Sequence, residues 1–184
     1  MEYFSIIWNS LEGLLSVLAG LLAGSIALVG FGIDSFIEVT SAGALLWRMH
    51  VDANAEKRER NERIALRIVG ACFVGLAIYI AVDAVMTLLA REPPERSIFG
   101  IAIALTSLVV MPLLARAKRR VAAGLNSAAM KADSRQTDFC MYLSSILLVG
   151  LVLNWLFGLW WADPLAALVM VPIIRERGRR RTPC

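Results

Sequence analysis

Apolar residues dominate this chain in long stretches that short polar segments separate. A helix needs about 20 mostly apolar residues to cross the roughly 30 Å hydrocarbon core of a bilayer, and several stretches reach that length. We therefore predict an all-α membrane protein with six transmembrane helices. Their expected ranges are 4–23, 25–47, 64–90, 98–115, about 125–154, and a shorter one at about 161–174.

The composition agrees with a membrane protein. Of the 184 residues, 58% are hydrophobic, whereas soluble domains contain about 45–50% apolar residues. The first apolar stretch is long and is followed too closely by a second one to be a cleaved signal peptide. We expect residues 1–174 to form one transmembrane domain and residues 175–184 to form a short basic cytoplasmic tail.

The positive charges are divided unevenly between the predicted loops. Of the 19 lysines and arginines, only Arg91 and Arg96 fall between the third and fourth helices. Under the positive-inside rule, the other loops and the tail are cytoplasmic, and so are both termini. We thus expect a multi-pass protein of the cell's inner (plasma) membrane. A basic tail beside a membrane helix is typical of a topology anchor near anionic lipid, so no nucleic-acid partner is expected.

The sequence offers no enzyme signature. Among the three cysteines, Cys72 and Cys140 lie within apolar helices, which indicates no disulfide framework. No segment matches a phosphate loop, a nucleotide fingerprint or a catalytic triad. We therefore expect no catalytic residues, no bound cofactor and no enzymatic activity.

Two carboxylates lie inside the second apolar stretch, where burying a charge costs free energy. Asp34 and Glu38 are four residues apart in the string DSFIE, so in a helix they lie on one face with Cβ atoms about 6 Å apart. A charge at membrane depth costs roughly 2.5–3.5 kcal/mol on insertion scales, and such residues usually face a partner, a cavity or an ion. This spacing suits two ligands of one cation.

The fifth helix carries a second pair with the same spacing, Gln136 and Cys140. Glu38 lies 13 residues from the outer start of its helix, and Cys140 lies 14 residues from the outer end of the fifth helix. At 1.5 Å per residue, both are roughly 20 Å below the outer surface. The two pairs can therefore supply four ligands at one depth, and four ligands make the tetrahedral site that Zn²⁺ prefers.

These motifs resemble the cation diffusion facilitator family. GSIALVGFGIDSFIE stands where the family's second helix has its pair of carboxylates, and ADSRQTDFC aligns with the family's ADxxHxxxD. DPLAAL matches the usual start of the sixth helix. The resemblance implies six spans with cytoplasmic termini, a homodimer, and a membrane metal site at Asp34, Glu38, Gln136 and Cys140. It also identifies the chain as a short form without the family's cytoplasmic C-terminal domain.

Two departures from the family change the expected chemistry. Gln136 replaces the family's histidine, and Cys140 replaces its second aspartate. An amide is a weak donor, whereas a thiolate is a soft ligand that suits Zn²⁺ or Cd²⁺ better than Mn²⁺ or Mg²⁺. We therefore expect a secondary transporter that exports a divalent transition metal, Zn²⁺ first and then Cd²⁺ or Co²⁺, by proton antiport. Zn²⁺ is the transported ion and not a catalytic cofactor.

Each site residue also has a structural interpretation. Asp34 and Glu38 could form an interhelix pair with an arginine or a backbone donor; we favour metal binding because no lysine or arginine is expected at their depth. Gln136 could instead serve merely as a hydrogen-bonding group between helices, and Cys140 could be a buried core thiol that binds no metal. Asp133 is expected to be either ion-paired near the cytoplasm or a ligand on the entry path.

Other polar residues in the helices are expected mainly to bond to neighbouring helices. This applies to Asn9, and to Glu12 and Asp83 unless these two acids line the cavity or carry a proton. Asp138 is expected to form an ion pair or a dimer contact. Two rival functions remain: a non-transporting metal-binding or interaction protein, and a carrier of another substrate that uses Asp34 and Glu38 as proton relays.

Overall fold

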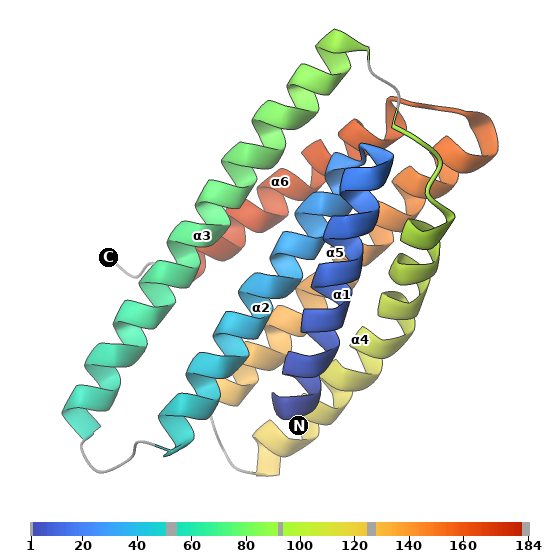
Figure 1. Cartoon of the computed structure of the whole chain (residues 1–184). Coiled ribbons are helices and arrows are strands. Elements are labelled where there is room, and N and C mark those ends of the chain that lie inside the picture. Colours follow the sequence, from blue (N-terminus) through green and yellow to red (C-terminus); the bar gives the residue numbers. More distant parts are fainter. Residues whose placement is uncertain (1, 51–54, 92–93, 125–127, 182–184) are drawn as a thin grey trace.

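The computed structural model describes residues 2–50, 55–91, 94–124 and 128–181. All regular secondary structure in these residues is helical (Figure 1), which confirms the predicted all-α fold. The helices are α1 (Glu2–Ala23), α2 (Ile26–His50), α3 (Ala55–Ala90), α4 (Ile98–Gly124), α5 (Ala128–Phe157) and α6 (Ala162–Arg181).

Five of these helices are long and apolar enough to cross a membrane, namely α1 to α5. The sixth predicted span is helical, but the last seven of the 20 residues of α6 are the arginine-rich sequence RERGRRR, which lowers its hydropathy. In Figure 1, α6 is shorter than its neighbours, and its end lies beside the middle of α3. The helix continues to Arg181, past residue 174, where we expected the transmembrane domain to end.

The second helix occupies the centre of the bundle. It contacts α1, α3, α5 and α6, while α4 packs mainly against α5. In its apolar segment 67% of the residues are buried, against 28–39% in the other four candidate spans. The polar side chains Asp34, Ser35 and Glu38 of α2 are buried and so enclosed by protein, which is where membrane proteins tolerate charged groups.

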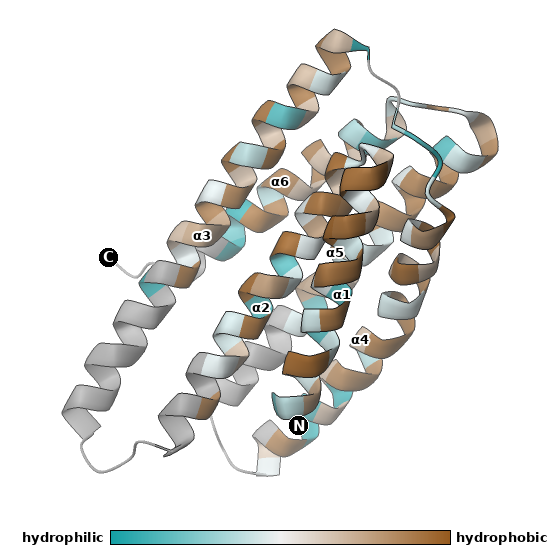
Figure 2. Ribbon diagram, in the orientation of Figure 1, coloured by the Kyte–Doolittle hydropathy of each residue, from teal (hydrophilic) through white to brown (hydrophobic). Residues whose placement is uncertain are grey.

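The first helix is polar on the inside and apolar on the outside. Its buried face repeats every three or four residues and carries five polar side chains: Glu2, Ser5, Asn9, Glu12 and Ser16. Large apolar side chains such as Ile7, Leu11 and Leu18 are exposed, and Figure 2 shows that much of α1 is hydrophobic. This arrangement fits a helix surrounded by lipid. Lipid tails are as apolar as leucine side chains, so there is no hydrophobic driving force to bury these residues inside the bundle.

The starts of α2 and α6 are tied together by one buried carboxylate. Asp163 Oδ1 accepts a hydrogen bond from the Ser25 hydroxyl at 2.5 Å, and Oδ2 accepts one from the Ile26 amide at 3.1 Å. Ser25 also caps α2, since its Oγ accepts a bond from the Leu28 amide at 3.2 Å. The contact fixes α6 relative to the helix that carries the two acids.

Candidate metal centre

Asp34 and Glu38 lie on the enclosed face of α2, as the sequence predicted. Asp34 is fully buried and Glu38 is 5% exposed. Their position depends on close contact between α1 and α2: a Cβ atom on Gly32 would lie 2.9 Å from the carbonyl oxygen of Gly13. Glycines at this crossing let the two backbones approach, which brings the polar face of α1 against the acids.

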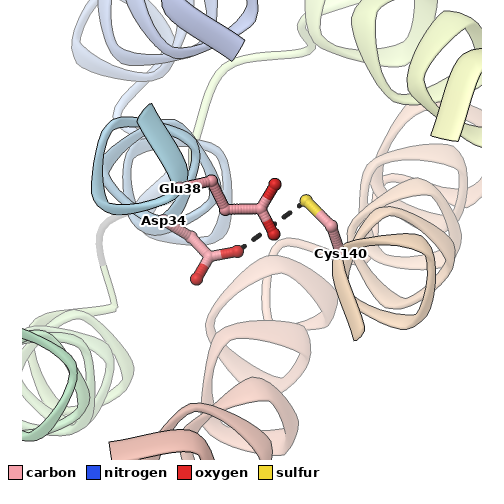
Figure 3. A group of neighbouring side chains, drawn as sticks. All are labelled: Asp34, Glu38 and Cys140. Carbon is pink, nitrogen blue, oxygen red and sulfur yellow. Dashed lines mark hydrogen bonds between the residues drawn. The ribbon is translucent and has the colours of Figure 1, made fainter. Parts of the chain in front are cut away.

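Cys140 on α5 completes a cluster with these two acids. Its side chain is fully buried, and its Sγ lies 3.8 Å from Oδ2 of Asp34. One potential ligand atom from each of Asp34, Glu38 and Cys140 lies within 4.8 Å of the other two. Figure 3 shows the carboxylates of α2 and the thiol of α5 pointing toward one another. The predicted meeting of the two helices at this depth is confirmed, and we call these three residues the acid–thiol cluster.

The fourth predicted ligand cannot be placed. Gln136 lies in α5, one helical turn before Cys140, but its side chain is outside the described residues, and the same holds for Asp133. Both therefore remain predictions. Asp83 is half-buried on α3 and does not belong to the acid–thiol cluster.

A basic residue that we did not expect contacts the cluster. Nη1 of Arg177, near the end of α6, donates to both carboxylate oxygens of Asp34 at 2.7 and 2.9 Å. Its Nη2 lies 3.6 Å from Oε1 of Glu38. Our premise that no arginine reaches this depth was wrong, because α6 is short and its last turns lie beside the middle of the bundle.

Two aromatic rings hold the guanidinium of Arg177 in this position. Its central carbon lies 5.4 Å from the ring centre of Phe73 on α3 and 5.2 Å from that of Phe139 on α5. Such distances give an attractive cation–π interaction, which is stronger where water is excluded. Arg177 is 5% exposed, so the acid–thiol cluster and this arginine form one enclosed unit from three helices, α2, α5 and α6.

The polar face of α1 adds a further layer of hydrogen bonds. Asn9 Nδ2 donates to Oε2 of Glu38 at 3.1 Å, and the Ser35 hydroxyl donates to Oε2 of Glu12 at 3.0 Å. The expected bonds of Asn9 and Glu12 to a neighbouring helix are thereby confirmed. Contact of Asn9 with the site itself was missed, although the regular spacing of polar residues in the first helix could have indicated it.

Asp138, which we expected in an ion pair or a dimer contact, forms an ion pair. Arg119 Nη1 donates to both of its carboxylate oxygens at 2.7 Å. The pair is largely exposed, with side-chain exposures of 49% and 31%. Asp138 lies only two residues from Cys140 but does not join the acid–thiol cluster, and the first of its two expected roles, an ion pair, is confirmed.

The donor atoms of the acid–thiol cluster suit a divalent transition metal. Two carboxylates and a thiolate combine hard and soft ligands, and this mixture is compatible with Zn²⁺. A helical membrane bundle with a buried acidic ion-binding cluster at its centre is typical of a membrane carrier of cations.

Comparison with known proteins assigns the family. The family model described as the cation efflux transmembrane domain matches residues 3–180. The chain therefore belongs to the cation efflux family, whose members are membrane transporters, and the resemblance drawn from the motifs is confirmed.

Individual relatives are more distant. The chain is 28% identical to an uncharacterised transporter of Synechocystis and 27% identical to one of Methanocaldococcus jannaschii, over 80% and 94% of its length. It is 24% identical over 84% of its length to the cation-efflux pump FieF of Cronobacter sakazakii. These matches cover 49%, 62% and 53% of the relatives' own lengths, so the chain spans about half to three-fifths of each.

Proposed function

We propose that this protein exports a divalent transition-metal cation, Zn²⁺ first, in exchange for protons. The observation that carries the proposal is the acid–thiol cluster: Asp34, Glu38 and Cys140 bring three potential ligand atoms within 4.8 Å of one another inside the bundle. Ionisable residues buried at membrane depth usually mark an ion or proton pathway. Membership of a cation-efflux family supports the direction of transport.

The choice of metal follows from the ligands. Thiolate favours Zn²⁺ and Cd²⁺ over Mn²⁺ and Mg²⁺, and Co²⁺ is a further candidate because it accepts the same ligands. Gln136, one helical turn from Cys140, is proposed as the fourth ligand through its amide oxygen. Water or backbone oxygen would complete the coordination.

Proton exchange follows from competition for the same atoms. Metal ligands must be deprotonated, so binding of the metal releases protons and binding of protons releases the metal. Asp34, Glu38 and Cys140 are the groups that would carry these protons. We further propose that both termini face the cytoplasm, that the protein resides in the inner membrane, and that it acts as a homodimer.

The test is Zn²⁺ uptake into proteoliposomes that contain the purified protein under an imposed pH gradient. We expect gradient-driven flux that Asp34→Ala abolishes. The matched control is Asp138→Ala, which also removes one carboxylate but from the exposed pair with Arg119; its flux should equal that of the wild type.

The outcomes separate the alternatives. Flux that survives Asp34→Ala would contradict transport through this site. Zn²⁺ binding without flux would favour a non-transporting metal-binding protein. If neither flux nor binding is found, zinc is the wrong ion.

A second candidate function is favoured by Arg177. Because the guanidinium contacts both acids, the carboxylates could serve as a structural pair in a non-transporting protein, or as proton relays in a carrier of another substrate. Cys140→Ala distinguishes these functions from soft-metal export. It should abolish Zn²⁺ flux in a metal exporter and leave a proton relay or structural pair intact.

A further inference from the structure

We infer that Arg177 is a tethered competitor of the transported metal: its guanidinium occupies the cation position of Asp34 and Glu38 and must leave before a divalent ion binds there. This inference rests on the proposed function, since it assumes that the acid–thiol cluster binds a metal. It adds a residue from α6 that sets how tightly the metal is held.

The contacts show that arginine and metal need the same atoms. Nη1 of Arg177 bonds to both carboxylate oxygens of Asp34 at 2.7 and 2.9 Å, and Nη2 faces an oxygen of Glu38 at 3.6 Å. A metal bound to Asp34 would need those oxygens at about 2.0–2.2 Å. It would then lie within a few ångströms of a buried positive charge, where repulsion is poorly screened.

The charge balance leads to the same conclusion. With Arg177 in place, the two ionised carboxylates and the guanidinium carry a formal charge of −1. Without the guanidinium the carboxylates carry −2, which matches a divalent cation. The structure therefore shows the cluster in a state whose negative charge is partly offset from within the chain, and the metal-bound state is the one with Arg177 withdrawn.

The chain provides a means of withdrawal at Pro172. This residue lies inside α6, five positions before Arg177, and proline removes one hydrogen bond from a helix and favours a bend there. A bend at Pro172 would move the last turns of α6 without disturbing the anchor at Asp163. The opening of α6 and the binding of metal would then be two parts of one event.

The experiment compares Zn²⁺ affinity between Arg177→Gln and the wild type in nanodiscs, by competition with a zinc-sensitive chelating dye. Gln keeps polar bonding but removes the charge. If the site is open in only a fraction of the molecules, the apparent Kd equals the Kd of the open site divided by that fraction. The charge-assisted bonds from Nη1 to both oxygens of Asp34 keep the fraction small, so we expect Arg177→Gln to lower the Kd at least about 10-fold.

The control variant is Arg179→Gln, two residues further along α6. Arg179 is exposed and lies 3.7 Å from Glu176, so its substitution changes the net charge equally without touching the cluster. Its Kd should equal that of the wild type. Arg177→Lys restores a charge without the planar fork and should move the Kd back toward the wild-type value.

Thermal unfolding provides a second readout that does not depend on the dye. In chelator, Arg177→Gln should unfold at a lower temperature than the wild type, because the buried carboxylates lose their counter-ion. Zn²⁺ should then raise its Tm by more than it raises that of the wild type. If the variant folds only when Zn²⁺ is supplied, that result also supports competition.

A clear result would overturn the inference while leaving the proposed function standing. If the wild type binds Zn²⁺ and Arg177→Gln binds it with equal or lower affinity, Arg177 supports the site and does not compete for it. Absence of Zn²⁺ binding in the wild type and in every variant would instead refute the metal site itself, and the inference with it.

Discussion

Removal of the Asp163 carboxylate tests how α6 is held at the depth where Arg177 meets the acids. In Asp163→Ala the chain loses two buried hydrogen bonds to a carboxylate, one from the Ser25 hydroxyl and one from the Ile26 amide. Hydrogen bonds to charged groups contribute about 1.5–3 kcal/mol each. We therefore expect the free energy of unfolding to fall by about 3 kcal/mol or more.

This loss can be measured as a shift in melting temperature. For a chain of this length, 1 kcal/mol corresponds to about 2–4 °C, so Asp163→Ala should lower the Tm by roughly 6–12 °C. The assay is thermal unfolding in a mild detergent, followed by thiol exposure or by loss of the monodisperse chromatographic peak. Zn²⁺ affinity should not fall, because the proposed ligands lie on α2 and α5 and a less firmly anchored α6 holds Arg177 less tightly against Asp34.

Asp138→Ala is the matched control for this measurement. It also removes one aspartate, but from the exposed pair with Arg119, and exposed ion pairs contribute about 0–1 kcal/mol. If Asp163→Ala and Asp138→Ala unfold within about 2 °C of each other, the Asp163 contacts do not anchor α6.

Two further predictions concern helix packing and metal preference. In Gly32→Ala the new Cβ would lie 2.8 Å from the backbone nitrogen of Val17. Because α1 and α2 must then separate, we expect a lower Tm. The control is Gly43→Ala, which has open space around it and should leave the Tm unchanged. In Cys140→Ser the soft ligand near Asp34 becomes a hydroxyl, which should weaken Cd²⁺ binding more than Mn²⁺ binding. Equal losses for the two ions in competition titrations would argue against ligation by sulfur.

The central part of the site was predictable because it depends on helix periodicity alone. Residues four apart share a face, and equal depth follows from counting residues along two helices. These two rules were sufficient to predict that Asp34 and Glu38 lie close to Cys140. The helices α1 to α5 followed equally directly from the lengths of the apolar stretches.

Arg177 was not predictable by the same reasoning. A run of arginines after an apolar stretch is ordinarily cytoplasmic, and that rule assumes that the stretch is long enough to reach the far surface. Here the apolar part of α6 is short, running only from Ala162 to residue 174, so Arg177 in the basic part that follows lies inside the bundle. Only the packing of α6 against α3, which brings Phe73 beside the guanidinium, shows where the arginine lies.

The pairing of Asp34 with Arg177 also has a consequence for biosynthesis. The two partners are separated by 143 residues, and at a synthesis rate of about 5–20 residues per second the arginine follows the aspartate by roughly 7–30 s. During that interval α2 is already made while its counter-charge is not. The acids must therefore enter the bilayer protonated or sheltered by the insertion machinery, and the cluster acquires its counter-charge only when α6 has been added.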